Sequence, residues 1–276
     1  MKYSKLIVPF ICMLLFSCKE EPIYIPPLGQ NNPANTTRPH RVLIEEFTGV
    51  RCVNCPDGAA EIENLRSKYG ENLVTVSIHA GDFAKKLSAS KYDFKIADGV
   101  SLLNFLGSPE GYPSVVINRK PFGTNNTLNV VGLAKWAGIV KEEADINPEA
   151  DLKTTIEYDK NSRVVKATVN IEPLVNMSGE HHLTVFLTES NIVDAQTVPI
   201  IGVKPDYVHK HVLRQSLTNY DGQPITETLT KGKIVSKTFT YTLPAEFKSK
   251  DCEIVAFIHK SGTSKQVVQA VAGKVE

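Results

Sequence analysis

The chain has 276 residues, of which 31 are basic and 30 acidic, and 42% of its residues are hydrophobic. This length is sufficient for two domains of ordinary size. The near-neutral charge provides no basic surface of the kind that binds nucleic acid or anionic membranes, so the composition favours neither partner.

An export signal is the first predicted element. Lys2 and Lys5 precede an apolar run over residues 6–16. That run is shorter than the roughly 20 residues that span a bilayer, and it fits a secretory signal. It ends in LLFSC, which resembles the lipobox of bacterial lipoproteins. The resemblance implies a signal peptide over residues 1–17 and a lipid on Cys18; a plain signal peptide or an N-terminal anchor is the alternative.

Residues 18–39 are predicted to form a tether. Lys19–Glu21 resemble the surface-export signal of lipoproteins in some diderm bacteria, although an ordinary solvated tether would have the same composition. The following residues are rich in Pro, Asn and Thr and lack apolar periodicity, which is typical of a linker. Several acyl chains on Cys18 would hold the folded body on a membrane durably.

Cysteine usage becomes informative once the export signal is removed. Cys12 lies in the signal peptide and Cys18 would be acylated, so Cys52, Cys55 and Cys252 remain. Exported proteins occupy compartments where disulfides persist. The count therefore predicts one close pair and one leftover thiol.

The next elements predict an α/β domain over residues 40–146. Residues 40–47 and 72–80 are strand-like, and between them the spacing of Ile62, Leu65 and Tyr69 predicts a helix that begins near Cys55. Strand, helix and strand indicate a parallel pair with a right-handed crossover. Further helices are expected around Leu102, Phe105 and Leu106 and over residues 128–145, where Trp136 and Ile139 share an apolar face.

A C-x-x-C pair at the start of a helix in this context predicts a thioredoxin-like redox motif. Cys52 would be exposed and nucleophilic, and Cys55 would be more buried and would resolve the mixed disulfide. Arg51 replaces the aromatic residue usual in thioredoxins and could help to stabilise a thiolate. Two alternatives remain: an inert staple, or half of a metal site to which His79 could contribute.

Two further features resemble thioredoxin-fold proteins. Glu46 lies six residues before Cys52, where that fold often has a buried acid that takes the proton of the second cysteine. Glu46 pointing to solvent is the alternative. Pro113, after Tyr112 and before an apolar strand, resembles the cis-proline that packs against the cysteine pair and shapes the substrate groove.

Residues 147–276 alternate between apolar and polar positions, which predicts an all-β sandwich of immunoglobulin type. We expect seven strands, at 151–159, 163–173, 181–190, 209–217, 235–244, 252–260 and 265–273. Alternation would place His209 and His211 on one face of the fourth strand, where we expect a solvated or hydrogen-bonded face rather than a metal site. Cys252 is expected to be a half-buried thiol at a strand start.

The motifs VLIEEFTGVRCVNCP, VSIHAGD, YPSVVINR and HKHVLRQ, with IVAFIHK and QVVQA near the end, together resemble the outer membrane protein 28-related lipoproteins. The resemblance covers roughly residues 40–275. It implies a thioredoxin-like domain followed by a β-domain, and an outer-membrane location, on the periplasmic or the surface face.

Two functions follow from the sequence. The first is a thiol–disulfide oxidoreductase of the cell envelope with Cys52, Cys55, Glu46 and Pro113 as catalytic residues and the thiols or disulfides of exported proteins as substrates. The second is a non-catalytic surface lipoprotein whose thioredoxin-like domain is a scaffold and whose β-domain binds a partner or takes part in surface assembly. We expect no cofactor and no metal, and contact with the membrane through the lipid on Cys18.

Overall fold

The computed structural model describes residues 38–276, so the predicted signal peptide, Cys18 and nearly all of the tether lie outside the described residues. The helices are α1 (Cys55–Tyr69), α2 (Ala97–Leu106) and α3 (Trp136–Ala144). The strands are β1 (Val42–Thr48), β2 (Leu73–His79), β3 (Ser114–Ile117), β4 (Asn129–Val131), β5 (Ala150–Asp159), β6 (Val164–Pro173), β7 (His181–Glu189), β8 (Ile192–Val198), β9 (Gly202–His209), β10 (Val212–Ser216), β11 (Gln223–Pro224), β12 (Val235–Thr242), β13 (Cys252–Lys260) and β14 (Val267–Lys274).

The largest sheet is mixed and has nine strands, in the order β14-β13-β7-β10-β2-β1-β3-β4, with β11 paired to β7. β1 and β2 are parallel and are joined by α1, which confirms the predicted strand–helix–strand unit. β3 and β4 follow as antiparallel strands. Strands from both segments of the chain share this sheet, because β10 pairs with β2.

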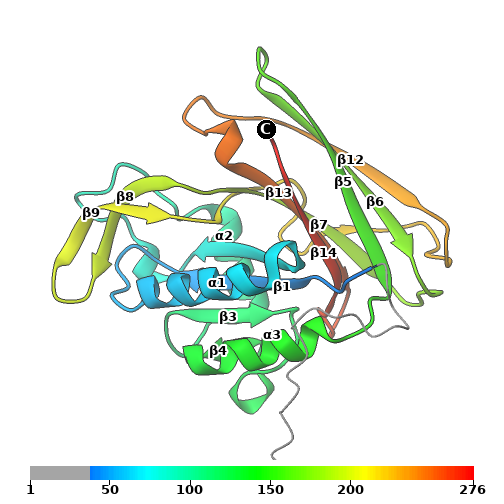
Figure 1. Ribbon diagram of the computed structural model, residues 1–276, viewed down its shortest axis with the longest axis horizontal. Coiled ribbons are helices and arrows are strands. Elements are labelled where there is room, and N and C mark those ends of the chain that lie inside the picture. The colour runs from blue at the N-terminus through cyan, green and yellow to red at the C-terminus, as the bar shows by residue number, and fades with distance from the viewer. Residues whose placement is uncertain (1–37) are drawn as a thin grey trace, which may run out of the picture. The chain divides into compact units, whose positions relative to one another are not determined.

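Helices cover both faces of the β2-β1-β3-β4 part of the sheet (Figure 1). α1 and α3 pack on one face, where Trp136 and Val140 join the side chains of β1 and β3. α2 packs on the other face, together with Phe186 and Phe257 from β7 and β13. This layered mixed sheet agrees with the predicted α/β fold of the first segment.

Smaller antiparallel sheets complete the second segment. β5, β6 and β12 form a three-stranded sheet that packs on β7, β13 and β14 through a shared apolar core. β8 and β9 form a two-stranded sheet of their own. The division at residue 147 and the immunoglobulin type of the β-rich segment stay predictions.

Two sequence predictions are corrected here, and one hairpin was missed. Residues 209–217 are not one strand: β9 ends at His209, the chain turns at His211 with φ 53°, and β10 begins at Val212. The expected helix over 128–145 is shorter, because Asn129–Val131 pair with β3 as β4. The β8–β9 hairpin was not predicted, although the turn residues Pro199 and Gly202 lie between its two strands. Within residues 38–276, no helix has the length and hydropathy that crossing a membrane requires.

Candidate redox site

The two cysteines of the motif form a disulfide at the beginning of α1. Cys55 is the first residue of the helix, Pro56 follows it, and the Cα atoms of Cys52 and Cys55 are 5.4 Å apart. Pro56 suits the first turn, since the missing N–H has no acceptor there. Gly49 permits the tight loop before the motif, because a Cβ atom there would lie 2.4 Å from the backbone of Phe83.

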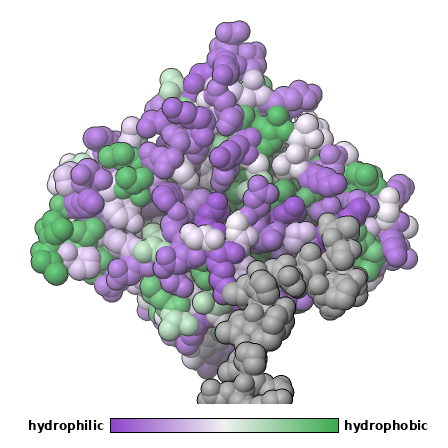
Figure 2. Space-filling model, viewed as in Figure 1, coloured by the Kyte–Doolittle hydropathy of each residue, from purple (hydrophilic) through white to green (hydrophobic). Residues whose placement is uncertain are grey.

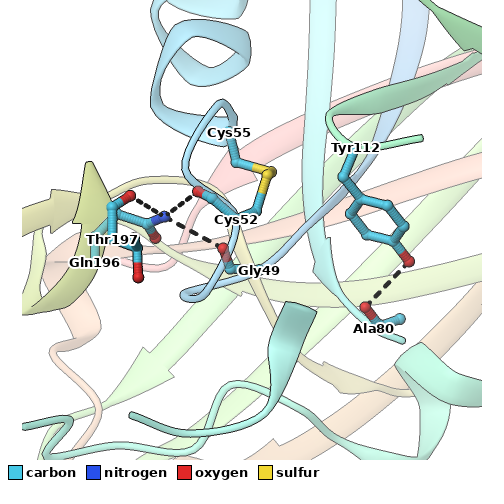
Figure 3. The surroundings of a disulfide bond; sticks show 7 residues. All are labelled: Gly49, Cys52, Cys55, Ala80, Tyr112, Gln196 and Thr197. Carbon is cyan, nitrogen blue, oxygen red and sulfur yellow. Dashed lines mark hydrogen bonds between the residues drawn. A yellow bond between two sulfur atoms is a disulfide. The ribbon is translucent and has the colours of Figure 1, made fainter. Parts of the chain in front are cut away.

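Both cysteines are buried, with 3% of Cys52 and 2% of Cys55 exposed. The prediction that Cys52 is exposed is therefore wrong. The β8–β9 hairpin holds the backbone of this loop, because Nε2 of Gln196 donates to the carbonyl oxygen of Cys52 at 2.9 Å and to that of Gly49 at 3.2 Å (Figure 3). A segment more than 140 residues away in sequence thus holds the loop that carries the disulfide.

Support of a thiolate by Arg51 stays a prediction, and its guanidinium group contacts a neighbouring loop. Its Nε donates to the carbonyl oxygen of Lys85 at 2.7 Å, and its Nη2 donates to that of Lys86 at 2.6 Å. The guanidinium group therefore fastens the 85–86 loop beside the motif.

Glu46 lies on β1 and is buried, with 1% of the residue exposed, so the alternative of a solvent-facing acid is excluded. Ser77 Oγ donates to its Oε2 at 2.8 Å, whereas Oε1 has no partner among the described residues. Burial raises the pKa of Glu46 to about 7, and the hydrogen bond from Ser77 opposes that shift. A carboxyl group with this pKa can exchange a proton near neutral pH.

The Pro113 loop meets α1 and Glu46 at a glycine. The Tyr112–Pro113 peptide bond is cis, as the resemblance to thioredoxin-fold proteins implied. A Cβ atom on Gly58 would lie 2.7 Å from Cβ of Pro113 and 3.2 Å from Oε1 of Glu46. Gly58, one turn into the helix, therefore lets the proline loop and the acid approach the motif closely. A glycine inside the predicted helix could have indicated this close approach, but the sequence analysis did not identify Gly58.

A cavity of about 270 Å³ adjoins the site. Its lining comes from the start of α1, from β1 and β2, and from the β8–β9 hairpin with the turn after it. The residues are Glu46, Thr48, Cys55, Pro56, Ala59, Ala60, Ile62, Glu63, Ser77, His79, Gln196, Tyr207, Val208, His209, Lys210 and His211. Sequence analysis singled out several of them but did not predict that they meet, because the hairpin brings them together.

Two histidines of this cavity, His79 and His209, are buried. His79 packs against Phe94 and His209, with ring centroids 4.9 Å and 5.8 Å away. Burial lowers the pKa of His79 well below its usual value and that of His209 to about 4. Both rings are therefore neutral at pH 7.

At the edge of the cavity, Glu63 binds two residues of the turn after β9. His211 Nε2 lies 3.1 Å from its Oε1, and Lys210 contacts its Oε2. The hydrogen bond from His211 is the main reason that the pKa of Glu63 is lowered to about 2. This contact ties α1 to the turn that follows the hairpin.

Besides the cysteine pair, the sequence raised a metal site and a thiol at Cys252. No group of three or more His, Cys, Asp or Glu side chains suited to a metal ion occurs within residues 38–276. Cys252 begins β13 as predicted but is fully buried rather than half-buried. Burial raises the pKa of its thiol to about 12, so this cysteine is inert as a nucleophile.

Comparison with known families matches residues 107–276 to the family described as outer membrane protein Omp28. The match covers more than half of the chain. The chain belongs to this family. Membership in the Omp28 family places the protein at the outer membrane and implies an N-terminal lipid anchor.

Solved structures of other proteins have a fold similar to that of this chain. The chain matches HBP35 of Porphyromonas gingivalis with a TM-score of 0.66 and 20% identity, over 87% of this chain and 76% of that one. It also matches protein AGR_C_4864 from Agrobacterium tumefaciens with a TM-score of 0.55 and 14% identity, over 87% and 96% of the two chains. A comparison with curated proteins found no match.

Proposed function

We propose that this Omp28-family lipoprotein exchanges thiols and disulfides with exported proteins through Cys52 and Cys55. One observation carries the proposal: the disulfide spans the first turn of α1, where the buried Glu46 carboxyl, with a pKa of about 7, and Pro113 meet the helix at Gly58. This set of groups is what a dithiol exchange needs, namely a nucleophile, a resolving thiol and a proton acceptor.

The proposed reduction of a substrate proceeds in two displacements. The thiolate of Cys52 attacks one sulfur of the substrate disulfide, and the other substrate sulfur leaves as a thiolate. The carboxylate of Glu46 then takes the proton of Cys55, whose thiolate attacks Sγ of Cys52. The second substrate thiolate leaves, and the Cys52–Cys55 disulfide is restored. The reverse sequence oxidises a substrate dithiol, and Pro113 would shape the groove in which the substrate lies.

Measurement of the reduction potential tests this proposal. An exchanging pair is expected above roughly −300 mV, whereas a structural disulfide is expected below that value. In the reduced protein, Cys52 should be alkylated near pH 6, where an ordinary thiol of pKa about 8.5 barely reacts. Cys55→Ser should trap a mixed disulfide with the natural substrate, and Cys52→Ser is the matched control that should not. A potential below the threshold together with slow alkylation would rule out the enzyme.

Burial of both cysteines favours a second candidate function. With 3% and 2% of these residues exposed, the disulfide would be a staple inside a scaffold, and the β-rich segment would bind a partner or take part in surface assembly. The double variant Cys52→Ser/Cys55→Ser separates the two functions. If a partner still binds saturably to this variant, the result supports the scaffold function. If binding is lost together with the disulfide, the result does not support it.

Under the enzyme proposal, we expect the β8–β9 hairpin to restrain the opening of the motif loop toward a substrate, because it binds the backbone of that loop. Thr197 N–H donates to the carbonyl oxygen of Val50 at 2.8 Å, beside the two bonds from Gln196. Gln196→Ala should therefore accelerate reduction of the disulfide by dithiothreitol by about tenfold, the equivalent of about one net hydrogen bond.

Gln215→Ala is the matched control for this experiment. Its side chain donates to the carbonyl oxygen of Ser216 at 2.9 Å and not to the motif loop. Reduction rates followed by thiol alkylation should stay at the wild-type value in this control. Equal rates for all three proteins would mean that the hairpin does not limit access.

A further inference from the structure

The outer end of the β8–β9 hairpin exposes apolar side chains. Ile200 is fully exposed and Ile201 is 73% exposed. Val203, the first apolar residue after the turn, is 43% exposed. Figure 2 shows apolar surface gathered over this hairpin, at the end of the molecule farthest to the left. Exposed apolar side chains that cluster in one place indicate an interaction site, whereas single ones do not.

The most exposed residue of this turn, Ile200, also has a strained backbone conformation. Ile200 has φ 67°, in the left-handed region. A β-branched residue is rare there, because its side chain crowds the backbone, and Gly or Asn would be accommodated at less cost. Strain at an exposed position without packing partners suggests that the side chain has a use outside the folded chain.

Charge is also absent from the end of the hairpin. Residues 195–203 contain no ionisable side chain, and Lys204 follows directly. Lysine can place its ammonium group in water while its aliphatic stem lies along an apolar phase. An uncharged apolar turn next to a lysine therefore suits the boundary between water and lipid.

We propose that the β8–β9 turn docks on a lipid surface, with Ile200 and Ile201 inserted among the acyl chains. The Omp28 family places the protein at the outer membrane. The twenty residues from Cys18 to the start of the described body span about 70 Å at most. An anchored body is thus confined close to a bilayer, where even a weak apolar contact is occupied. The proposal does not depend on the redox chemistry.

Depth-dependent fluorescence quenching tests the proposal on the acylated mature chain. Ile201→Cys would carry an environment-sensitive dye, since Cys252 is fully buried and the other two cysteines form a disulfide. The chain is reconstituted in vesicles of phosphatidylethanolamine and phosphatidylglycerol that contain a lipid-attached quencher. Emission from position 201 should be at least about twofold lower with the quencher than without it, as expected for insertion to about 5–10 Å.

Two further variants make the result decisive. Val175→Cys, in the turn after β6 and 44% exposed, carries the same dye and should not be quenched. Adding Ile200→Asn to the labelled Ile201→Cys chain removes an apolar side chain at a position that Asn accommodates, so the fold should persist and quenching at 201 should decrease. Equal quenching at 201 and 175, or none at 201, would overturn the proposal. A change at 201 that depends on protein concentration without vesicles would assign the turn to self-association instead.

Discussion

Glu45→Ala is expected to destabilise the folded protein by about 3–5 kcal/mol, because it leaves the guanidinium group of Arg119 buried without its partner. Neither side chain is exposed to solvent. Arg119 Nε and Nη2 donate to the two carboxylate oxygens at 2.8 Å and 2.7 Å. The same guanidinium group lies 4.7 Å from the ring centre of Phe257 on β13, so the pair joins β1 to the second segment of the chain.

Urea unfolding measures this effect against two comparisons. Glu157→Ala removes an exposed carboxylate paired with Lys166 at 3.3 Å, and its cost should be within about 0.5 kcal/mol. Glu45→Leu combined with Arg119→Met replaces the ion pair with apolar side chains and should recover most of the lost stability. A loss below about 1 kcal/mol for Glu45→Ala would contradict the buried pair.

The pH dependence of stability should contain a contribution from Glu46 that falls as the pH rises. Its pKa is about 7 in the folded protein, against 4.5 for an ordinary glutamate. Between these values the folded state holds a proton that the unfolded state has released, so stability decreases through this range. The full effect is about 3 kcal/mol, complete above pH 7 and absent below pH 4.5.

Glu46→Gln should remove this contribution, because the amide stays neutral at every pH. Relative to the wild type, the variant should gain about 3 kcal/mol between pH 4 and pH 8. Other titrating groups cancel in this comparison, and near pH 4 both side chains are neutral. Denaturation curves at the two pH values measure the difference. Parallel pH profiles for the two proteins would mean that the Glu46 carboxyl is not held in its neutral form.

Local patterns predicted much of the fold. The two parallel strands, α1 and its end near Gly70, the strand after Pro113 and most β-strands of the second segment follow from apolar periodicity and turn residues. These features depend on neighbours a few residues away. The break at His211 was missed because a turn inside an alternating run leaves the alternation nearly intact.

The candidate site was predicted only in part. Cys52, Cys55, Glu46 and Pro113 were identified from spacing and from resemblance, and the structure brings the last three together around Gly58. Gln196 and Tyr207 were not identified, because their place beside the motif depends on how the hairpin packs. For the same reason, the exposure expected for Cys52 could not be judged from the motif.

The sequence by itself predicts an export and lipoprotein signal, and it determined the position of the cysteine pair at a helix start and the alternation of the later strands. Only the tertiary structure decided that β10 extends the sheet beside β2, that Glu45 pairs with Arg119 and that a hairpin holds the backbone of the loop that carries the disulfide. Periodicity and turn chemistry act within one element, so they can be recognised in a short stretch of sequence. Long-range pairing depends on the free energy of burying whole faces together, and many arrangements of the same elements satisfy the local pattern equally well.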